Sequence, residues 1–164
     1  MGRAGSGLFL QALVAFLALP GVVAFAVPYL LVRPSLPVGN PSWPGLIVLG
    51  AGLLILGRCV RDFYVAGAGT LAPWAPPQRL VVTGLYRFSR NPMYLGVLCI
   101  VAGWAIVFRS STMGWYATGL LALFHLRVVL GEEPYLARAH GAEWEAYRSS
   151  VPRWLGRVRA GKGG

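Results

Sequence analysis

The sequence predicts an all-α integral membrane protein: about four transmembrane helices, followed by a cytoplasmic amphipathic helix near the C-terminus. Of the 164 residues, 56% are hydrophobic and only 12% are charged, and the mean hydropathy is +0.60. A soluble domain carries roughly 25% charged residues, so this chain has too little charge to cover a globular surface. The apolar residues fall in four runs, and most basic residues fall between or after those runs. The length fits a single membrane domain spanning residues 1–164.

The four apolar runs define the expected membrane helices. A spanning helix needs about 20 apolar residues, within a range of roughly 17–25. The third run is shorter than that, so it needs polar flanks that snorkel or a tilted neighbour. The expected spans cover about residues 8–32, 43–60, 93–108 and 113–130.

The first run has some features of a cleaved signal peptide. Arg3 precedes an apolar core, and residues 24–26 read Ala-Phe-Ala, a small-residue pattern typical of cleavage sites. The apolar character continues through residues 28–32, which is longer than a signal core needs. We therefore expect residues 1–26 to be retained, with Pro20 and Pro28 interrupting the first helix.

The placement of arginine and lysine predicts the orientation in the membrane. All but three of the 15 basic residues lie at the N-terminus, between the second and third runs, or after the fourth run. The exceptions are Arg33, Arg109 and Arg127. Because basic loops stay in the cytoplasm, both termini and residues 58–90 are expected on the cytoplasmic side. In a bacterium the protein would occupy the cytoplasmic membrane.

Nucleic-acid binding and metal binding are not indicated. The net charge of +10 comes from arginines that flank apolar runs, and these do not form a basic stripe interleaved with aromatic residues. Cys59 and Cys99 lie within or beside apolar runs, where a free thiol behaves as a small hydrophobic group. His125 has no carboxylate or thiol at ligand spacing, so no metal site is expected.

The segments outside the apolar runs differ in character. Residues 67–77 contain three prolines and are expected to be irregular, because proline excludes a continuing helix. Residues 80–84 fit a short extended piece that ends in a glycine turn. Near the C-terminus, Trp144, Tyr147 and Val151 have the spacing of one helical face, which predicts the amphipathic helix.

Residues 84–96, Gly-Leu-Tyr-Arg-Phe-Ser-Arg-Asn-Pro-Met-Tyr-Leu-Gly, place polar groups at the mouth of the third apolar run. Pro92 fits the first turn of a helix and restricts Asn91 to extended geometry, so the helix is expected to begin there. The free N–H groups of a helix N-terminus favour an anionic ligand group. Tyr94 follows on the helix, and Gly96 lets a bulky group approach the backbone. The alternative is an arginine anchor with an interfacial tyrosine.

Glu132 and Glu133 form an adjacent pair of carboxylates in a chain with only five acidic residues. One interpretation is a cap for the C-terminal helix, with acids in its first turn and Pro134 near its start. The other is a site that accepts hydrogen bonds from ribose hydroxyls or an ammonium group. Both interpretations stay open from the residues alone.

Taken in order, these motifs resemble those of the isoprenylcysteine carboxyl methyltransferase and phospholipid methyltransferase superfamily. The resemblance covers about residues 80–155 and implies an integral membrane enzyme that uses S-adenosylmethionine. It implies a cofactor pocket at the cytosolic face, built by the Arg-Asn-Pro-x-Tyr-x-Gly segment and the glutamate pair, with lipid substrates entering laterally between helices. The motifs are residues 84–96, Glu132-Glu133-x-x-Leu136, Gly141-x-x-Trp144-x-x-Tyr147 and Val151-Pro152-Arg153.

The resemblance also implies roles for individual residues. Glu133 is the candidate base for an amine acceptor, and a basic side chain would steer an anionic substrate group. Asn91 stands where the isoprenylcysteine enzymes typically have histidine, and this difference argues against membership of that subgroup. The cofactor-binding candidates are Tyr86, Arg90, Asn91, Pro92, Tyr94, Gly96, Glu132 and Glu133, and the catalytic candidates are Glu133, Arg90, Arg148 and Arg153.

The expected activity is S-adenosylmethionine-dependent methyl transfer to a lipidic or hydrophobic acceptor at the cytosolic membrane face. The acceptor atom is a carboxylate, a thiolate or an amine, and membrane lipid is the expected partner. The soluble dinucleotide-binding fingerprint Gly-x-Gly-x-x-Gly after a strand does not occur. Two other classes stay open: an NADPH-dependent membrane reductase of similar helical layout, and a non-enzymatic membrane scaffold in which the motif residues only anchor the chain.

Overall fold

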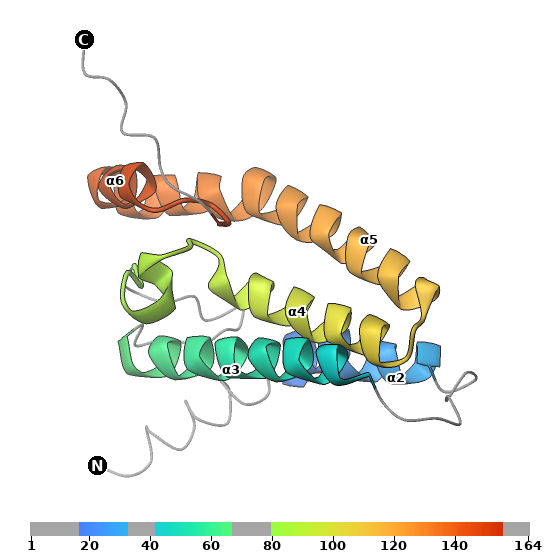
Figure 1. Cartoon of the computed structure of the whole chain (residues 1–164). Coiled ribbons are helices and arrows are strands. Elements are labelled where there is room, and N and C mark those ends of the chain that lie inside the picture. The colour runs from blue at the N-terminus through green and yellow to red at the C-terminus, as the bar shows by residue number, and fades with distance from the viewer. Residues whose placement is uncertain (1–16, 33–41, 67–79, 156–164) are drawn as a thin grey trace, which may run out of the picture.

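The computed structural model describes residues 17–32, 42–66 and 80–155, which are helical with no strand among them (Figure 1). In chain order the elements are the π-helical segment η1 (Leu17–Ala26), α2 (Val27–Val32), α3 (Trp43–Ala66), the 3-10 turn η3 (Gly84–Arg87), α4 (Pro92–Val107), α5 (Ser111–Arg127), the π-helical turn η4 (Val128–Glu132) and α6 (Glu133–Ser150). Three expectations lie outside the described residues: the start of the first helix, retention of the N-terminus and the irregular stretch at residues 67–77.

Two of the helical stretches are long and apolar enough to cross a membrane. They are Trp43–Asp62 and the stretch Ser111–Ser150, whose apolar part is α5 and η4 and which kinks at Gly141 (φ 48°). Pro20–Leu31 and Pro92–Val107 are shorter apolar helices. The all-helical fold is confirmed for the described residues. That four helices span the membrane, and that both termini are cytoplasmic, stay predictions.

The observed helix ends differ from the expected ones at two places. α3 continues past residue 60 to Ala66, and its last turns carry the i,i+4 pair of Arg58 and Asp62, with Nε 3.8 Å from Oδ1. After α5 the chain does not turn but passes through η4 directly into α6. Pro134 is the second residue of α6, and because it has no N–H it interrupts the intrahelical hydrogen bonding directly after the π-helical turn η4.

α3 and α4 pack closely because glycines bring their backbones together. A Cβ on Gly52 would lie 2.7 Å from the backbone nitrogen of Ile100, and a Cβ on Gly103 would lie 2.7 Å from the Cα of Leu49. No real Cβ tolerates such distances to backbone, so both positions require glycine. Small residues at contacts between helices are a common packing device in membranes.

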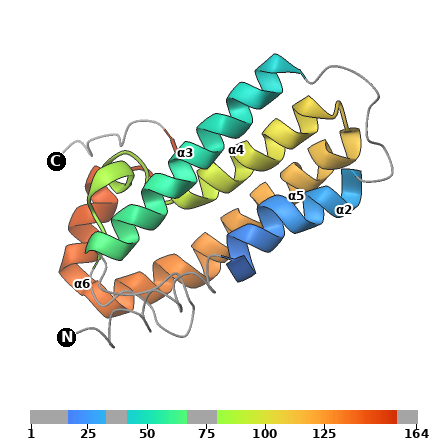
Figure 2. The same ribbon diagram turned by 90° about the horizontal axis from the view of Figure 1, so that it is seen from below.

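The first helix is tied to α4 and α5 through carbonyl groups that Pro28 leaves without a partner. An α-helix would pair the carbonyl of Ala24 with the N–H of residue 28, and a π-helix would pair that of Val23 with it. Because proline has no N–H, both carbonyls need other donors. Trp104 Nε1 lies 3.1 Å from the carbonyl oxygen of Ala24, and Tyr116 Oη lies 3.0 Å from that of Val23. Figure 2 shows η1 and α2, in blue, running along α4 and α5. These two hydrogen bonds satisfy buried backbone groups that would otherwise be costly.

Among the described residues, three groups of buried side chains pack the helices together. The largest group links η1, α3, α4 and α5. At the end where α3 finishes and α6 begins, Trp144, Tyr147 and Val151 pack against Leu80 and Leu136. This contact confirms the shared apolar face predicted for the C-terminal helix. The largest group comprises Ala24, Leu56, Val97, Ile100, Val101, Leu120 and Phe124.

Candidate functional site

The candidate site lies at the end of the bundle where residues 84–91, the N-terminus of α4 and the start of α6 meet (Figure 1). Gly84 opens the turn with φ +59, the left-handed conformation that glycine adopts without strain. A Cβ at Gly84 would also lie 1.9 Å from Asp62 Oδ2, so the predicted glycine turn is confirmed and has no room for another residue. The carbonyl of Tyr86 then accepts a 2.8 Å hydrogen bond from Tyr147 Oη, which fixes the turn to α6.

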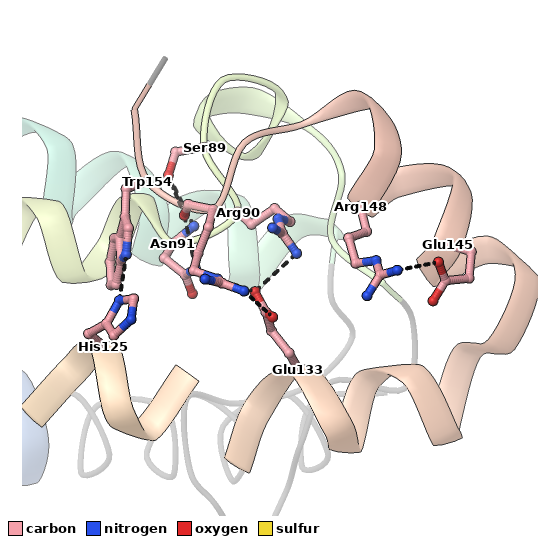
Figure 3. A network of polar contacts seen from close by, with 9 residues as sticks. Ser89, Arg90, Asn91, His125, Glu133, Glu145, Arg148 and Trp154 are labelled. Carbon is pink, nitrogen blue, oxygen red and sulfur yellow. Dashed lines mark hydrogen bonds and ion pairs between the residues drawn. The ribbon is translucent and has the colours of Figure 1, made fainter. Parts of the chain in front are cut away.

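Asn91 departs from its expected extended backbone, while Pro92 begins α4 as expected. The φ and ψ of Asn91 are −130° and 49°, which contradicts the extended geometry predicted from the following proline. Local hydrogen bonds explain the difference: the backbone N of Asn91 lies 3.1 Å from Ser89 Oγ, and its Nδ2 lies 3.0 Å from the carbonyl oxygen of Arg153. Figure 3 shows Ser89 and Asn91 close together in this network.

The segment after α6 runs beside residues 89–91. The backbone N of Arg90 donates to the carbonyl of Pro152 at 2.9 Å, and Ser89 Oγ donates to the carbonyl of Arg153 at 3.4 Å. These contacts join positions more than sixty residues apart in the chain. They bring the two basic side chains of the region to the same carboxylate.

Glu133 is that carboxylate. Arg153 binds it through two N–H groups on one edge of its guanidinium, with Nε 2.7 Å from Oε1 and Nη2 2.8 Å from Oε2, the fork geometry of a strong ion pair. Arg90 Nη1 approaches Oε1 to 3.0 Å, at an angle outside that of a hydrogen bond (Figure 3). The Arg90 side chain is only 9% exposed, and its guanidinium carbon lies 5.3 Å from the ring centroid of Trp144.

The electrostatics of this group favour an additional anion. Burial lowers the pKa of Arg90, which Glu133 partly offsets and Arg153 reinforces. Burial acts to raise the pKa of Glu133, but the hydrogen bonds from Arg153 and the charge of Arg90 bring it below its ordinary value. The carboxylate is therefore ionised between two cations. Arg90 Nε and Nη1 are buried and make no hydrogen bond to the described residues, so two donor atoms of Arg90 are left for a ligand.

Glu132, the adjacent residue, belongs to a different network. Tyr94 Oη donates to Glu132 Oε1, and Arg127 Nε lies 2.9 Å from the same oxygen and 3.0 Å from Tyr94 Oη. This network is more open than the first, since the side chains of Arg127 and Glu132 are 52% and 34% exposed. The two glutamates therefore face two separate sets of partners.

Aromatic side chains pack around Tyr94 in the second network. The ring of Tyr94 lies 4.5 Å, between centroids, from that of Phe124 and 6.4 Å from that of Trp154. Trp154 Nε1 donates to His125 Nδ1 at 3.2 Å, so neutral His125 carries its proton on Nε2 (Figure 3). The segment after α6 is thus anchored on α5 as well as on residues 89–91.

The structure brings most of the predicted site residues together but directs three elsewhere. Gly96 faces α3, where a Cβ would lie 3.1 Å from the backbone nitrogen of Leu56. The Tyr86 side chain packs with Cys59 and Val81. Arg148 forms an exposed pair with Glu145, with Nη2 3.0 Å from Oε2, and acts on Glu133 only through its charge (Figure 3). The predicted residues that share the two networks are Arg90, Asn91, Tyr94, Glu132, Glu133 and Arg153.

Sequence reasoning missed several participants. Arg127 entered only the orientation argument, because an arginine five residues before Glu132 does not share its face on an α-helix. The π-helical turn η4 widens the helix at this point and brings the two side chains together. The contacts of Trp154 with His125 and of Trp144 with Arg90 join distant parts of the chain and leave no local pattern. Ser89 likewise gives no signal of its contact with residue 153.

The described residues form an apolar helical bundle with two charged networks at one end, which is compatible with a membrane protein that has a polar site at its boundary. The family model described as phospholipid methyltransferase matches residues 45–143. The phosphatidylethanolamine N-methyltransferase of Rattus norvegicus is 33% identical over 113 residues, which is 66% of this chain and 51% of that relative. The chain belongs to the phospholipid methyltransferase family, which confirms the superfamily resemblance.

The matches cover only part of the relative and part of the candidate site. The chain spans about half the length of the curated relative it matches. The matched region includes Tyr94, Arg127 and Glu132. It ends at residue 143, so it leaves out Trp144 and Arg153 of the network around Glu133. No solved structure matches the chain.

Proposed function

We propose that this chain transfers a methyl group from S-adenosylmethionine to the amine of a membrane phospholipid at the cytosolic face. Family membership supports a membrane methyltransferase, and the name of the rat relative supports an ethanolamine lipid as acceptor. The observation that carries the cofactor assignment is the pairing of Glu133 with two arginines, of which Arg90 has buried donors that make no hydrogen bond within the described part of the chain.

The groups around Glu133 fit the amino-acid part of S-adenosylmethionine. That part carries a carboxylate and an ammonium group, and the adjoining ribose carries hydroxyls. Arg90 supplies a free donor for the carboxylate, and the Glu133 oxygens are acceptors for ammonium or hydroxyl groups. Asn91 keeps its side-chain oxygen uncommitted among the described residues, because only its Nδ2 is used for Arg153.

When bound, S-adenosylmethionine supplies a methyl group on positively charged sulfur. The neutral amine of the acceptor gives its electron pair to the new carbon–nitrogen bond, the carbon–sulfur pair stays on sulfur, and the amine proton is released to water at the membrane face. The residues of the chain hold and orient the reactants, a contribution that reaches about 7–11 kcal/mol in well-aligned cases. The contacts of Glu133 favour binding over proton transfer. Both of its oxygens are engaged by Arg153, and its lowered pKa makes it a weak base.

Isothermal titration of the detergent-purified protein with S-adenosylmethionine tests the proposal. Glu133→Gln should weaken binding about 10-fold or more, as expected for losing a charged hydrogen-bond partner. Glu145→Gln is the matched control, because Glu145 is an exposed carboxylate on the same helix. Binding of NADPH in place of S-adenosylmethionine would favour a reductase, and binding of neither would favour a scaffold.

Transfer of radiolabelled methyl groups identifies the acceptor. Label should enter phosphatidylethanolamine in mixed micelles and resist release by base, as an N-methyl group does. Base-labile label would instead indicate a methyl ester on a carboxylate acceptor. Label in a prenylated thioether acid, with none in the phospholipid, would overturn the assignment of the acceptor.

A further inference from the structure

We infer that the apolar belt of this bundle fits a thin bilayer, and that phospholipids with short acyl chains bind against the outer face of α3. This face is the row of exposed apolar side chains Trp43, Ile47 and Leu54. The inference concerns the membrane around the protein, so it goes beyond the proposed methyl transfer and does not depend on it. It rests on the predicted membrane crossing of α3, α4 and α5.

The first argument is the length of the apolar part of α3. The outer face begins at Trp43, which is 76% exposed, and the helix carries no charge before Arg58, whose side chain is 57% exposed. At about 1.5 Å per residue, these two positions lie about 22 Å apart along the helix. Tryptophan prefers membrane interfaces and arginine the head groups, so both residues mark limits of the hydrocarbon region. The hydrocarbon core of a typical bilayer is about 30 Å thick, which is several ångströms more.

The second argument is that α4 is equally short and cannot slide along α3. Its 16 residues give it a length of about 24 Å, and it lies side by side with α3 (Figures 1 and 2). Glycine contacts fix the register at both ends. A Cβ on Gly45 would lie 2.6 Å from the backbone nitrogen of Val107, and one on Gly96 would lie 3.1 Å from that of Leu56. The two short apolar stretches therefore coincide, and sliding one helix to make a thicker belt would break these contacts.

The third argument is that α5 carries its first cation at the same level. The ring of Phe124 lies 4.5 Å, between centroids, from that of Tyr94 in the first turn of α4. Arg127 Nε lies 3.0 Å from Tyr94 Oη, so this arginine is level with the start of α4. Leu130 carries the exposed apolar surface of α5 one turn further, so the belt is thinnest along α3 and α4.

The opposite end of the bundle has an equally clear limit. α4 passes into α5 through residues 108–110 only, so neither helix can gain an apolar residue there. Arg109 in this turn is exposed, and Trp115 in the second turn of α5 is 76% exposed. An exposed arginine beside exposed tryptophan is typical of a membrane interface.

The bundle itself cannot remove the mismatch. Tilting shortens the projection of a helix on the bilayer normal, so it helps only a helix that is too long. Arg58 directs its Nε towards Asp62 Oδ1, at 3.8 Å and one turn nearer the C-terminal end of α3, which covers part of the difference at one limit. The rest falls on the lipid, which thins next to a short belt. Lipids with short acyl chains do so at the lowest cost and should be enriched against the outer face of α3.

Quenching of tryptophan fluorescence by brominated phosphatidylcholine tests the inference, because the quencher must touch an exposed ring. The purified protein is reconstituted in vesicles in which brominated lipid of one chain length competes with unbrominated lipid of another. Dimyristoleoyl lipid should bind about 2-fold or more tightly than dioleoyl lipid, and dierucoyl lipid should bind more weakly than either. Equal binding of the dimyristoleoyl and dioleoyl lipids, or tightest binding of the dierucoyl lipid, would overturn the inference.

A longer apolar stretch should move this preference. Arg58→Leu extends the uncharged part of α3 to Arg61, by about 4–5 Å, so dioleoyl lipid should become the tightest binder. Arg138→Leu is the matched control, because Arg138 is an exposed arginine of α6, beyond the apolar stretches. An unshifted preference in Arg58→Leu, or the same shift in Arg138→Leu, would contradict the limit assigned at Arg58 and overturn the inference. If Arg58→Leu does not fold, the chain-length series of the unmodified protein decides alone.

A second copy of the chain is the alternative occupant of the outer face of α3. It would cover Trp43, and Trp43→Phe would then not lower the fraction of fluorescence that brominated lipid quenches. With lipid on this face, Trp43→Phe should lower the fraction, whereas Trp144→Phe, which removes a buried ring, should raise it. An unchanged fraction in Trp43→Phe would overturn the inference. These measurements use neither cofactor nor turnover, so their outcome is separate from that of the proposed function.

Discussion

Arg153 binds Glu133 through Nε and Nη2, which lie 2.7 and 2.8 Å from the two carboxylate oxygens, across twenty residues of chain. Because Arg153 follows α6 and Glu133 begins it, this ion pair folds the segment after the helix back onto the start of the same helix. The carbonyl of Arg153 at the same time accepts from Asn91 Nδ2. One residue thus fixes the C-terminal side of the site through both its backbone and its side chain.

Replacing Arg153 by lysine should weaken S-adenosylmethionine binding about 10-fold. Lysine keeps the charge but loses the two-point contact, and a hydrogen bond to a charged group contributes about 1.5–3 kcal/mol. Titration calorimetry measures the effect. Arg148→Lys is the control, because Arg148 forms an exposed pair that contributes about 0–1 kcal/mol. Equal losses in the two variants would contradict a specific role for Arg153.

Acid should remove the stabilisation that ionised Glu133 provides. Its pKa in the folded protein lies below the ordinary 4.5, so this stabilisation is complete above about pH 4.5 and is lost as the pH falls through the folded value. Thermal unfolding in detergent between pH 7 and pH 3 measures it. Glu133→Gln should melt lower than the unmodified protein at pH 7, and the gap should close in acid. A gap that stays constant over this range would show that the charge of Glu133 does not contribute.

Removing the donors that reach the first helix should destabilise the bundle. Trp104→Phe and Tyr116→Phe each leave a buried carbonyl without a partner, at a cost of about 1–3 kcal/mol. The free energy of unfolding in mixed micelles measures this cost. Trp115→Phe, at an exposed position of α5, is the matched control and should have little effect. A similar loss in all three variants would indicate a general effect of aromatic residues.

Adding one methyl group between α3 and α4 should also destabilise the protein. Gly103→Ala forces a contact with the backbone of Leu49, and overpacking of this kind costs about 1–3 kcal/mol. Gly57→Ala on α3 is the control, because nothing lies within 4 Å of a Cβ there. Alanine has the higher helix propensity, so the control should be neutral or slightly stabilising. The same unfolding measurement compares the two, and equal effects would contradict the packing argument.

The sequence predicted those features that depend on local chemistry. The start of α4 at Pro92, the turn at Gly84 and the shared face of Trp144 and Tyr147 each follow from one residue type or one helical spacing. The wrong prediction of an extended backbone at Asn91 was also made from local chemistry alone. A rule based only on the following proline omits the hydrogen bonds that Asn91 makes with Ser89 and with the carbonyl of residue 153.

The contacts that divide the site in two were not predictable in this way. The pairing of Arg127 with Glu132 depends on a π-helical turn, for which the sequence has no marker comparable to a proline or a cap. The choice of Arg153 over Arg148 as the partner of Glu133 depends on where the chain returns after α6. Only the folded chain distinguishes the two arginines.

Pro28 has a consequence for the order in which the protein assembles. The chain is synthesised from its N-terminus, so the first helix is made before the segments that contain Trp104 and Tyr116. Until those segments arrive, the carbonyls of Val23 and Ala24 have no donor from α4 or α5. The first helix therefore lacks these two hydrogen bonds until α4 and α5 have been made and packed against it. Its last stabilising contacts are supplied by residues made some ninety positions later.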